Sequence, residues 1–465
     1  MEFCQNVFLL ADEGGEFAAM ALAVGIPAVL FIVCLVYYWK STKRKRLIED
    51  TPTSKVKGVF IGLNEVKGSV ELRYPLQSYL NESPCCWYKY SIEEHYTRTR
   101  TVTDSKGNTR TETYSGWETV DSGTDRASFN LVDDTGKVHV LPNQAEMEGE
   151  KVFSQRCSIS DPLYYGKGPT MSVSGSNHRR KFKESAIVEN DDIYLLGSAR
   201  MSEVAAQVEI AFDEDDDVFM ISTKSESELV SRYTWRIWLT AFGIVICGTL
   251  LPMVIYGLVY QDLANAASAT WGWMILAGVG SVALTILMYV ILVFNGLVST
   301  QQRLLRAWSL IDIQLKRRYD LIANLVKVCQ SYMQHEQETL KLVSKARAGG
   351  GNVSEMPSAS EVQAGEQATR VQEVVIQRLF ALKEAYPELK ADQTMADLQD
   401  AITDAEDRLA IARTFYNAAT ANYNTRIRRV PEIWFASMFG YKRAAFYAVD
   451  SAQTKNVDVA VLLEE

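Results

Sequence analysis

Histidine is scarce in this sequence, and the few histidines lack the partners that metal binding needs. The 465 residues include four histidines. His95 and His139 have no cysteine or carboxylate partner at metal-ligand spacing, and His335 with Glu336 lacks the second histidine of an H-E-x-x-H zinc site. We therefore interpret His95 and His139 as surface or packing residues, place His178 in a basic loop, and predict no metal site.

Sequence motifs for enzymatic chemistry are also missing. No G-x-S-x-G, phosphate-binding loop or dinucleotide fingerprint occurs, so we name no catalytic residue and no cofactor. The net charge of −9 argues against a nucleic-acid-binding surface. The chain is predicted to have no nucleic-acid partner and, on balance, no enzymatic activity of its own.

The seven cysteines do not form a disulfide pattern. Cys34 and Cys247 fall in apolar runs and Cys329 falls on the apolar face of an expected helix, while Cys85 and Cys86 are neighbours and cannot easily bond each other. No C-x-x-C is present. These cysteines fit a reducing compartment.

Charge is absent from three long apolar stretches, although the mean hydropathy of the whole chain is only −0.08. They are Phe17–Trp39, Ile237–Tyr260 and Trp271–Phe294. Each has about the length that a helix needs to cross a bilayer, so we expect three transmembrane helices. The first is predicted to be an anchor rather than a cleaved signal peptide, because acidic residues precede it and no small-residue cleavage site follows.

Lysine and arginine are distributed unevenly around these runs. Residues 1–16 and 261–270 contain neither, whereas basic residues follow the first and third runs and precede the second. By the positive-inside rule, the chain is expected in a cell inner membrane with residues 1–16 outside and both soluble regions in the cytoplasm. The basic cluster after the first run is a candidate for anionic headgroups or, less favoured, a nuclear-type or nucleic-acid patch; its members are Lys43, Arg44, Lys45 and Arg46.

Residues 47–235 have the pattern of a β-rich cytosolic domain. Val and aromatic residues alternate between turn signals at 104–108, 115–116, 121–123 and 133–136, and the first and last of these predict hairpins. A small barrel or sandwich is the simplest fold for this pattern. Ser225 and Glu228 form an S-x-x-E capping box that predicts a helix leading into the second apolar run. The loop that contains Arg179 and Arg180 is a second candidate for lipid headgroups, with a solvated loop as the alternative.

The third apolar run continues into a long helical pattern. Apolar residues recur with coiled-coil-like 3-4 spacing up to about Arg347, and Gly296 is the one weak joint. Further helices are expected at about 361–386 and 392–429, and the three are predicted to form an antiparallel all-α bundle within residues 295–450, followed by a flexible tail at 451–465.

Helix lengths then give an expected position for the end of this bundle. If the second helix returns toward the bilayer and the longer third helix rises again, residues 431–439 lie at the membrane-distal tip. This apolar segment contains Trp434, Phe435 and Phe439, and is either a cap on the bundle or a partner-binding patch. Charges on the helical seam are predicted to form buried ion pairs that specify assembly; the candidates are Arg318, Glu336 and Arg426.

The helical region resembles a known family. The matching residues are Trp308-Ser-Leu-Ile-Asp312, Lys316-Arg-Arg318-Tyr-Asp320, Tyr386-Pro387-Glu-Leu-Lys-Ala391, Phe415-Tyr-Asn417 and Tyr423-Asn-Thr-Arg426. They resemble the LemA family over about residues 295–450, with a mild departure at Ala323, where the family often has proline. The resemblance implies a membrane-anchored helical bundle and no established biochemical activity.

The β-rich region resembles the GIDE, or beside-a-membrane, domain of MULAN-type ubiquitin ligases. The similar stretches are Gly62-Leu-Asn-Glu-Val-Lys-Gly68, Ser83-Pro-Cys-Cys-Trp-Tyr88, Tyr194-Leu-Leu-Gly197 and Phe219-Met-Ile-Ser222. In those ligases a RING domain carries the chemistry, and a RING needs eight Cys or His ligands. After residue 300 this sequence has only Cys329 and His335, so the resemblance does not imply ligase activity.

Together these patterns predict a multidomain membrane protein with three transmembrane helices, a β-rich cytosolic domain and an antiparallel helical bundle. The expected role is a non-enzymatic scaffold or assembly protein that forms a homo-oligomer or presents a platform to an unidentified protein partner. The alternatives are a component similar to a GIDE-type ubiquitin ligase, or a membrane-organising factor. A transporter is disfavoured because ionisable residues are absent from the interior of the apolar runs.

Overall fold

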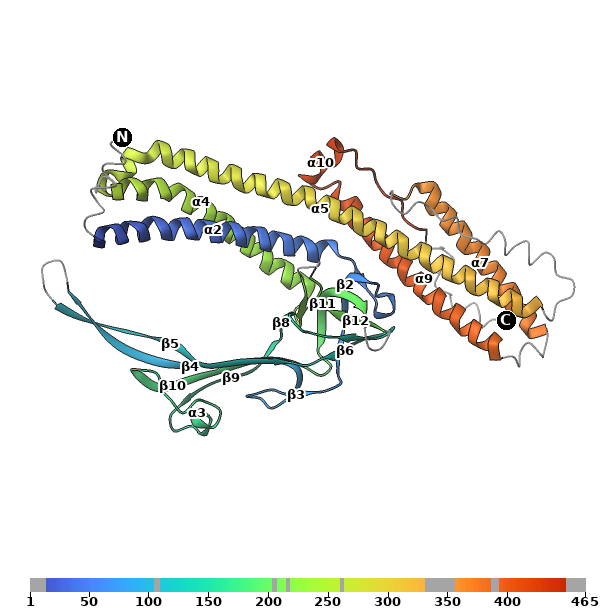
Figure 1. The fold of residues 1–465 in the computed structure, drawn as a ribbon, viewed down its shortest axis with the longest axis horizontal. Coiled ribbons are helices and arrows are strands. Elements are labelled where there is room, and N and C mark those ends of the chain that lie inside the picture. Colours follow the sequence, from blue (N-terminus) through green and yellow to red (C-terminus); the bar gives the residue numbers. More distant parts are fainter. Residues whose placement is uncertain are drawn as a thin grey trace, which may run out of the picture. The chain divides into compact units, whose positions relative to one another are not determined.

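The computed structural model describes residues 14–103, 109–202, 207–214, 218–259, 263–330, 356–385 and 393–448. Its contacts divide the chain into two compact units. One unit is Thr53–Glu228, and the other combines the chain up to Pro52 with the chain from Leu229 onwards. We describe each unit by itself (Figure 1).

The unit Thr53–Glu228 is built from two sheets. The first has the order β1-β2-β6-β7-β12-β11-β13-β8, and an additional pairing of β2 with β11 closes five of these strands into a small barrel. The second has the order β3-β4-β10-β9, with β5 beside β4. The strands are β1 Thr53–Ser54, β2 Gly62–Leu72, β3 Leu76–Gln77, β4 Pro84–Thr103, β5 Thr109–Arg126, β6 Phe129–Asp133, β7 Gly136–Val140, β8 Glu146–Glu148, β9 Glu150–Ser158, β10 Ser176–Val188, β11 Asp192–Met201, β12 Val208–Ala211 and β13 Met220–Ser222, with the short helices η2 Val56–Gly58 and α3 Pro162–Gly166.

Alternating apolar residues of the strands fill the barrel. Val66 and Val70 on β2, Leu131 on β6 and Leu195 on β11 are all buried in one core. This is the period-2 pattern that a strand shows when one of its faces is covered. The prediction of a β-rich domain with a small barrel is therefore confirmed.

Two of the four expected turns are not turns. β6 and β7 pair around the signal at 133–136 as predicted, and the signal at 104–108 lies outside the described residues. Gly116 and Gly123, however, lie inside β5, opposite Tyr96 and Tyr90 of β4. A Cβ at these glycines would lie 2.8 Å from the Tyr96 hydroxyl and 2.6 Å from the Tyr90 ring. The glycines make room for cross-strand aromatic rings, which is why they imitate turn signals in the sequence.

The predicted capping box is present. The Ser225 N–H donates to Glu228 Oε2 at 3.2 Å, and the Glu228 N–H donates to Ser225 Oγ at 3.4 Å. These reciprocal bonds satisfy donors that the first turn of a helix leaves free. Helix α4, Glu226–Val259, begins here.

The other unit consists of long helices. They are α2 Gly14–Asp50, α4 Glu226–Val259, α5 Leu263–Gln330, α7 Ala359–Ala385, α9 Gln393–Arg426 and α10 Glu432–Met438. Three of them contain stretches that are long and apolar enough to cross a membrane: Gly25–Asp50, Glu226–Tyr256 and Thr270–Cys329. Small residues lie at the contacts between these helices, as is common in membranes: Gly243 of α4 faces Cys34, and Gly248 of α4 faces Ser281.

Helix α5 continues from the third apolar run into the helical region without a loop, as predicted (Figure 1). Gly296 does not interrupt it. A Cβ at Gly296 would lie 2.9 Å from Nη1 of Arg46, and this Arg46 nitrogen donates to the carbonyl of Leu292 at 3.1 Å. Gly296 therefore provides the space that lets a guanidinium group from α2 contact the backbone of α5.

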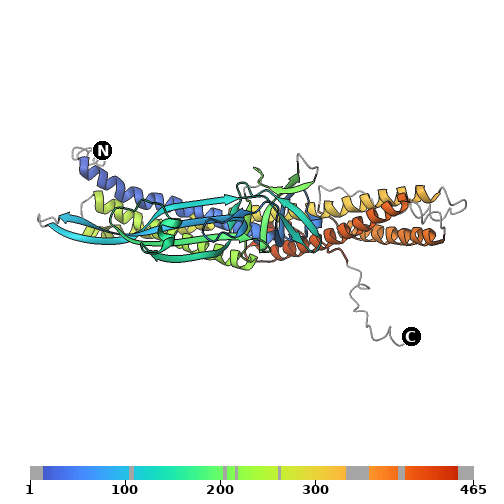
Figure 2. The ribbon, with the colours of Figure 1, turned by 90° about the horizontal axis from the view of Figure 1, so that it is seen from below.

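The second helix of the bundle runs in an unexpected direction. Gly365, near the start of α7, lies against Trp308 of α5, and Gln372 donates to the carbonyl of Leu315 at 3.3 Å. Helices α5 and α7 are therefore parallel, with their chains running in the same direction. Helix α9 is antiparallel to α5. Trp308 of α5 packs on Tyr416 of α9, with ring centroids 5.5 Å apart, whereas residues near the end of α5 pack with Met395 and Ile402, which lie earlier in α9. Figure 2 shows α7 and α9 beside the end of α5.

These directions correct the expected position of residues 431–439. We predicted that the second helix runs back toward the apolar runs and that the third helix ends at the tip of the bundle farthest from them. Instead α7 runs away from the apolar runs and α9 returns to them, so that Phe439 packs on Phe294 at the end of the third run, with ring centroids 5.1 Å apart. Helix lengths alone do not determine the direction in which each helix runs, and residues 331–355, between α5 and α7, lie outside the described residues.

Gly68 provides a test of the barrel. A Cβ at this position would lie 2.4 Å from the carbonyl oxygen of Val132, a backbone atom that cannot turn away. We expect Gly68→Ala to destabilise the domain by about 1–3 kcal/mol, the usual cost of overpacking. Faster hydrogen exchange in β2 and β6 of the purified full-length protein would show this, and Gly166→Ala, whose Cβ would meet nothing within 4 Å, should exchange like the wild type. Unchanged exchange in Gly68→Ala would contradict the barrel packing.

Candidate functional site

Four buried charges connect three helices where the apolar runs give way to the bundle. Nε of Arg426 donates to Asp50 Oδ1 at 2.7 Å, and its Nη1 donates to Glu432 Oε1 at 3.0 Å. Nη2 of Arg46 lies 3.5 Å from the same Glu432 oxygen. All four side chains are buried. We call Arg46, Asp50, Arg426 and Glu432 the charge clamp.

The charge clamp has two cations and two anions, and a third carboxylate, that of Glu49, lies 3.6 Å from Nη2 of Arg426 at its edge. The clamp joins the end of α2, the end of α9 and the start of α10, which are far apart in the sequence. Removing one member of a buried pair leaves the others uncompensated, which typically costs about 3–5 kcal/mol. The clamp therefore fixes how the bundle is mounted on the helix of the first apolar run.

An extended segment after α10 is fastened along α9. We call residues 441–448 the strap. Asn417 and Asn424 each make two hydrogen bonds to the backbone of one strap residue: Asn417 with Tyr447 at 3.0 and 2.9 Å, and Asn424 with Ala444 at 2.9 and 3.0 Å. Seven residues separate the two asparagines, so they lie on one face of the helix.

Two tyrosines beside these asparagines complete the attachment. The Tyr416 hydroxyl donates to the carbonyl of Ala445 and the Tyr423 hydroxyl donates to that of Lys442, both at 2.9 Å. Burial raises the pKa of each tyrosine to about 12, so both remain protonated donors. The repeated Tyr-Asn pair belongs to the motif that resembles the LemA family. Its seven-residue spacing is the signal in the sequence that indicates its role in holding the strap.

A cleft of about 670 Å³ lies between the strap, α5 and the start of α7. Apolar and aromatic side chains line one part of it and two cations line another. The lining includes Phe294, Gln301, Tyr423, Phe439, Lys442 and Arg443.

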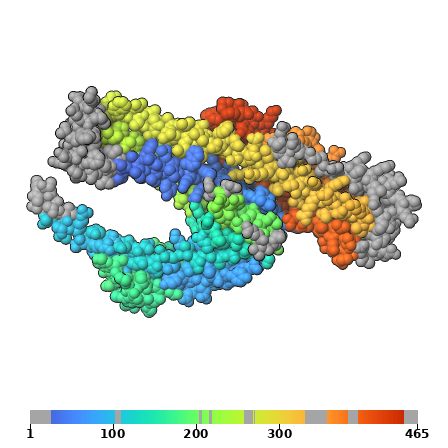
Figure 3. All heavy atoms as spheres, in the orientation of Figure 1, coloured from blue at the N-terminus to red at the C-terminus, as the bar shows by residue number. Residues whose placement is uncertain are grey.

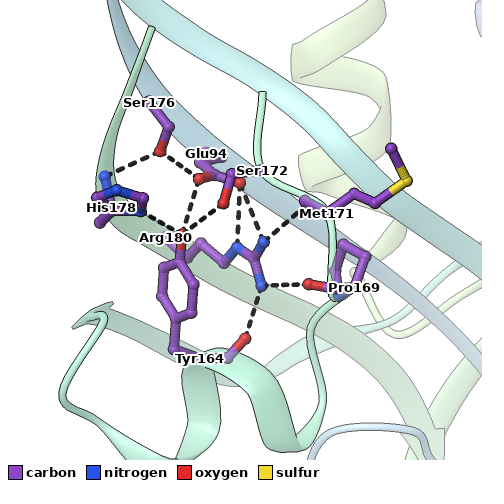
Figure 4. Close-up of polar contacts among 8 residues, drawn as sticks. All are labelled: Glu94, Tyr164, Pro169, Met171, Ser172, Ser176, His178 and Arg180. Carbon is purple, nitrogen blue, oxygen red and sulfur yellow. Dashed lines mark hydrogen bonds and ion pairs between the residues drawn. The ribbon is translucent and has the colours of Figure 1, made fainter. Parts of the chain in front are cut away.

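A second buried network lies in the β unit (Figure 4). Arg180 of β10 has no exposed side-chain surface, and its Nε and Nη2 donate to Glu94 Oε2 at 3.2 and 3.1 Å. The other donors reach the carbonyls of Tyr164, Pro169 and Met171 at 2.7 to 3.1 Å. All five N–H groups of the guanidinium are thus used within the protein.

Hydroxyl groups satisfy the carboxylate of Glu94 from the other side. Tyr164 donates to Glu94 Oε1 at 2.7 Å, and Ser176 donates to the same oxygen. Burial raises the pKa of Glu94, but the hydrogen bonds from Ser176, Tyr164 and Arg180 outweigh it and hold that pKa below its ordinary value of 4.5. The network holds α3 and the loop after it on the sheet, and it leaves no donor of Arg180 for a substrate.

Two family models match separate parts of the chain. A model of the LemA family matches residues 307–461, and the GIDE model, described as E3 Ubiquitin ligase, matches residues 98–255. The chain carries a LemA-family region joined to a GIDE region. Both resemblances stated above are confirmed.

Curated relatives match part of the chain. Magnetosome proteins MamQ 1 and MamQ 2 of Paramagnetospirillum magneticum are each 25% identical over 174 residues, covering 33% of this chain and 64% of theirs. Magnetosome protein MamQ of Magnetospirillum gryphiswaldense is 34% identical over 70 residues, covering 15% of this chain and 26% of its own length. The chain thus spans less than two thirds of the relatives it matches.

Two of the three candidate seam charges, Arg318 and Arg426, pair with carboxylates in the described part of the chain. Arg318 is buried and its Nη2 lies 2.6 Å from Glu406 Oε1, a partner that the sequence did not indicate. Arg426 belongs to the charge clamp, and Glu336 lies outside the described residues. Trp434 and Phe439 are exposed and Phe435 is half-buried. Any role of these residues in assembly stays a prediction.

Two of the six expected lipid-facing cations are wrong. Arg180 is enclosed in the GIDE region, and Arg46 is buried in the charge clamp, because in each case a carboxylate from another element offers a stronger partner than water. Lys45 pairs with Glu49 at 3.6 Å, and Arg179 is exposed. Lys43 and Arg44 have further interactions within the protein.

The histidines of the GIDE region serve in packing and hydrogen bonding. His95 lies against Trp117 and 2.8 Å from Asn177 Nδ2, and His139 Nδ1 lies 3.2 Å from Asn130 Oδ1. Among the described residues no group of three or more His, Cys, Asp or Glu side chains is arranged to hold a metal ion.

The charge clamp can be tested by replacing one of its arginines. Arg426→Met leaves the carboxylates of Asp50 and Glu432 without a shared cation, and we expect a loss of about 3–5 kcal/mol at the base of the bundle. Hydrogen exchange of the full-length protein should rise at the end of α9 and in α10. Arg378→Met, at an exposed position of α7, is the control and should change exchange little. Equal behaviour of the two variants would contradict the clamp.

Acid should loosen the GIDE region through Glu94. Because its folded pKa lies below 4.5, ionised Glu94 stabilises the fold at higher pH, and this contribution is lost as pH falls through the folded pKa. We expect Glu94→Gln to raise exchange in β10 and α3 at neutral pH by an amount equivalent to about 3–5 kcal/mol, and to show less further loss in acid.

Glu82→Gln is the matched control for that experiment. Glu82 lies 2.7 Å from Lys167, but 65% of its side chain is exposed, and surface pairs contribute little. Retention of wild-type exchange by Glu94→Gln at neutral pH would show that the buried ion pair does not hold α3.

Proposed function

We propose that this protein is a non-enzymatic, membrane-anchored scaffold of the LemA type. Its three apolar helices cross a cell inner membrane with the N-terminus outside, and the GIDE region and the LemA region both lie in the cytoplasm. The LemA region presents a platform on which copies of the chain or another protein assemble. The distribution of basic residues supports this orientation.

One observation carries the proposal: α5 is a single helix from the third apolar run into the LemA region. Because a continuous helix is rigid, α5 holds the bundle at a fixed angle to the membrane. A flexible linker would not. The charge clamp adds a second attachment from the first apolar run. Such a rigid mount suits a protein that positions partners.

The polar side chains of the LemA region support a structural role over catalysis. Arg318 is paired with Glu406, and Arg426 is shared by the carboxylates of Glu49, Asp50 and Glu432. The two Tyr-Asn pairs hold the strap. The printed names of the MamQ relatives assign them to the magnetosome and name no reaction.

Exposed apolar residues on the bundle identify the surface to test. Ile313 of α5 is 53% exposed and Val374 of α7 is 46% exposed. We expect the full-length protein in nanodiscs to have the mass of a discrete oligomer, or to retain a stoichiometric partner, and Ile313→Glu with Val374→Glu to weaken that association at least tenfold. Gln377→Glu, at an exposed polar position of α7, should leave it intact. A monomer that retains nothing would refute the scaffold.

The GIDE match supports a second candidate, a component of a ubiquitin ligase. The sequence after residue 300 lacks the ligands of a RING, so such a component needs a partner that supplies one. Purified protein should form no ubiquitin conjugates with activating and conjugating enzymes alone. Conjugation under those conditions would replace the scaffold proposal with an enzymatic one.

A further inference from the structure

The segment from Arg428 to Phe446 has a large exposed apolar surface. On α10, Trp434 is 66% exposed and Met438 is 67% exposed, and Phe439 directly after the helix is 54% exposed. The opposite side of α10 is held in the protein by Glu432, in the charge clamp, and by buried Ala436. The helix is thus amphipathic, with its apolar side uncovered. Figure 3 shows this region in red as a raised patch beside the yellow atoms of α5.

The geometry at the end of α10 fixes the position of this surface. Gly440 takes a left-handed conformation with φ of 71°, and the Tyr441 N–H donates to the carbonyl of Ala436 at 2.9 Å. These are features of a Schellman motif, which ends a helix abruptly. The chain then turns into the strap, which the asparagines and tyrosines of α9 hold. Phe439 is left facing outward beside Phe294.

The level of this patch coincides with the end of the third apolar run. Phe439 packs on Phe294, the last residue of that run. Thirteen residues separate Phe294 from Ser281 on α5, and thirteen separate Trp235 from Gly248 on α4. Because Gly248 faces Ser281, Trp235 lies at about the level of Phe294.

Aromatic residues at this level are exposed on more than one helix. Trp235 and Trp238 of α4 are each 70% exposed. Tryptophan is enriched where hydrocarbon meets headgroups, because its ring is apolar and its N–H is polar. Trp434 of α10 therefore lies where a membrane-interface aromatic residue is expected.

The exposed charges around α10 are all positive. Arg428 and Arg429 precede it, and Lys442 and Arg443 follow it, all exposed. None of these four side chains forms an ion pair within the described part of the chain. The acidic residue of α10, Glu432, is buried and neutralised by Arg46 and Arg426. An apolar helix side with cations at both ends is the pattern of a helix that lies in a membrane interface.

We propose that α10 is an interfacial membrane anchor. Its occupant is the bilayer that holds the apolar helices: Trp434, Met438 and Phe439 enter the leaflet on the side of the LemA region, and the four cations contact anionic headgroups. The bundle is then attached to the membrane by α5, by the charge clamp and by α10. This inference rests on the proposed membrane crossing.

Spin labels can measure the depth of α10 in the full-length protein reconstituted into nanodiscs. A label at Met438→Cys should be more accessible to oxygen, which concentrates in lipid, than to a water-soluble nickel complex. A label at Gln377→Cys, at an exposed polar position of α7, should show the reverse. We expect the ratio of the two accessibilities to differ at least fivefold between these positions.

A third label separates the proposal that α10 is a membrane anchor from the proposal that the apolar helices cross the membrane. Val279 in the third apolar run is 62% exposed, so Val279→Cys should report lipid if the run crosses the membrane. Lipid at Val279 with water at Met438 would overturn the anchor alone, and water at both would overturn the proposed crossing. A Met438 label shielded from both probes would indicate contact with another protein and would also overturn the anchor.

The cations are tested by lipid composition. We expect the Met438 label to lie deeper in nanodiscs that contain phosphatidylglycerol than in phosphatidylcholine alone, with the difference reduced at high salt. Replacing Arg428, Arg429, Lys442 and Arg443 by glutamine should remove at least half of that difference. Replacing Arg306 and Arg370, which lie elsewhere in the LemA region, should not. A depth that is the same in both lipids would refute the role of the four cations.

Discussion

The charge clamp is the interaction on which the arrangement of the helical unit depends. Arg426 binds Asp50, which is far from it in the sequence, and Glu432, which is six residues away. Arg46 of α2 pairs with the same Glu432. Burying four charges is costly, and a purely apolar contact at this place would be no less stable. What the ions add is a defined geometry, because a guanidinium group satisfies its carboxylates in few orientations. The direction of α9 and the position of α10 both follow from that geometry.

The sequence was sufficient to locate the long helices and insufficient for the directions in which they run. Charge-free runs revealed the three apolar helices, since membrane crossing depends on length and polarity alone, and the 3-4 spacing revealed α5 as one helix. The path of α7 and α9 was predicted wrongly because periodicity describes which side of a helix is apolar and says nothing of which end meets which neighbour. That information lies in pairs such as Arg318 with Glu406, which no spacing rule connects.

Candidate residues were affected by the same limit. Arg46 and Arg180 were expected at lipid headgroups because each lies in a basic stretch, and local sequence contains no sign of the carboxylate that buries it. Glu94 is far from Arg180 along the chain and adjacent to it across the sheet. In contrast, the Ser225 capping box was predicted correctly, because both of its hydrogen bonds lie within four residues. Local hydrogen bonds could be predicted, and distant ion pairs could not.

The correction to Trp434 changes the meaning of the residues around it. At the far tip of a rod, an apolar helix flanked by arginines is a surface for a protein partner, since no lipid is within reach. Beside Phe294 the same residues lie at the end of the third apolar run. Under the proposed membrane crossing, the nearest cover for their apolar surface is the bilayer that holds this run. Binding a separate partner requires the loss of its translational freedom, whereas a neighbouring leaflet requires no such loss. Under this proposal the bundle beyond α10 remains free to receive partners, so the two proposed uses of the LemA region fall on different surfaces.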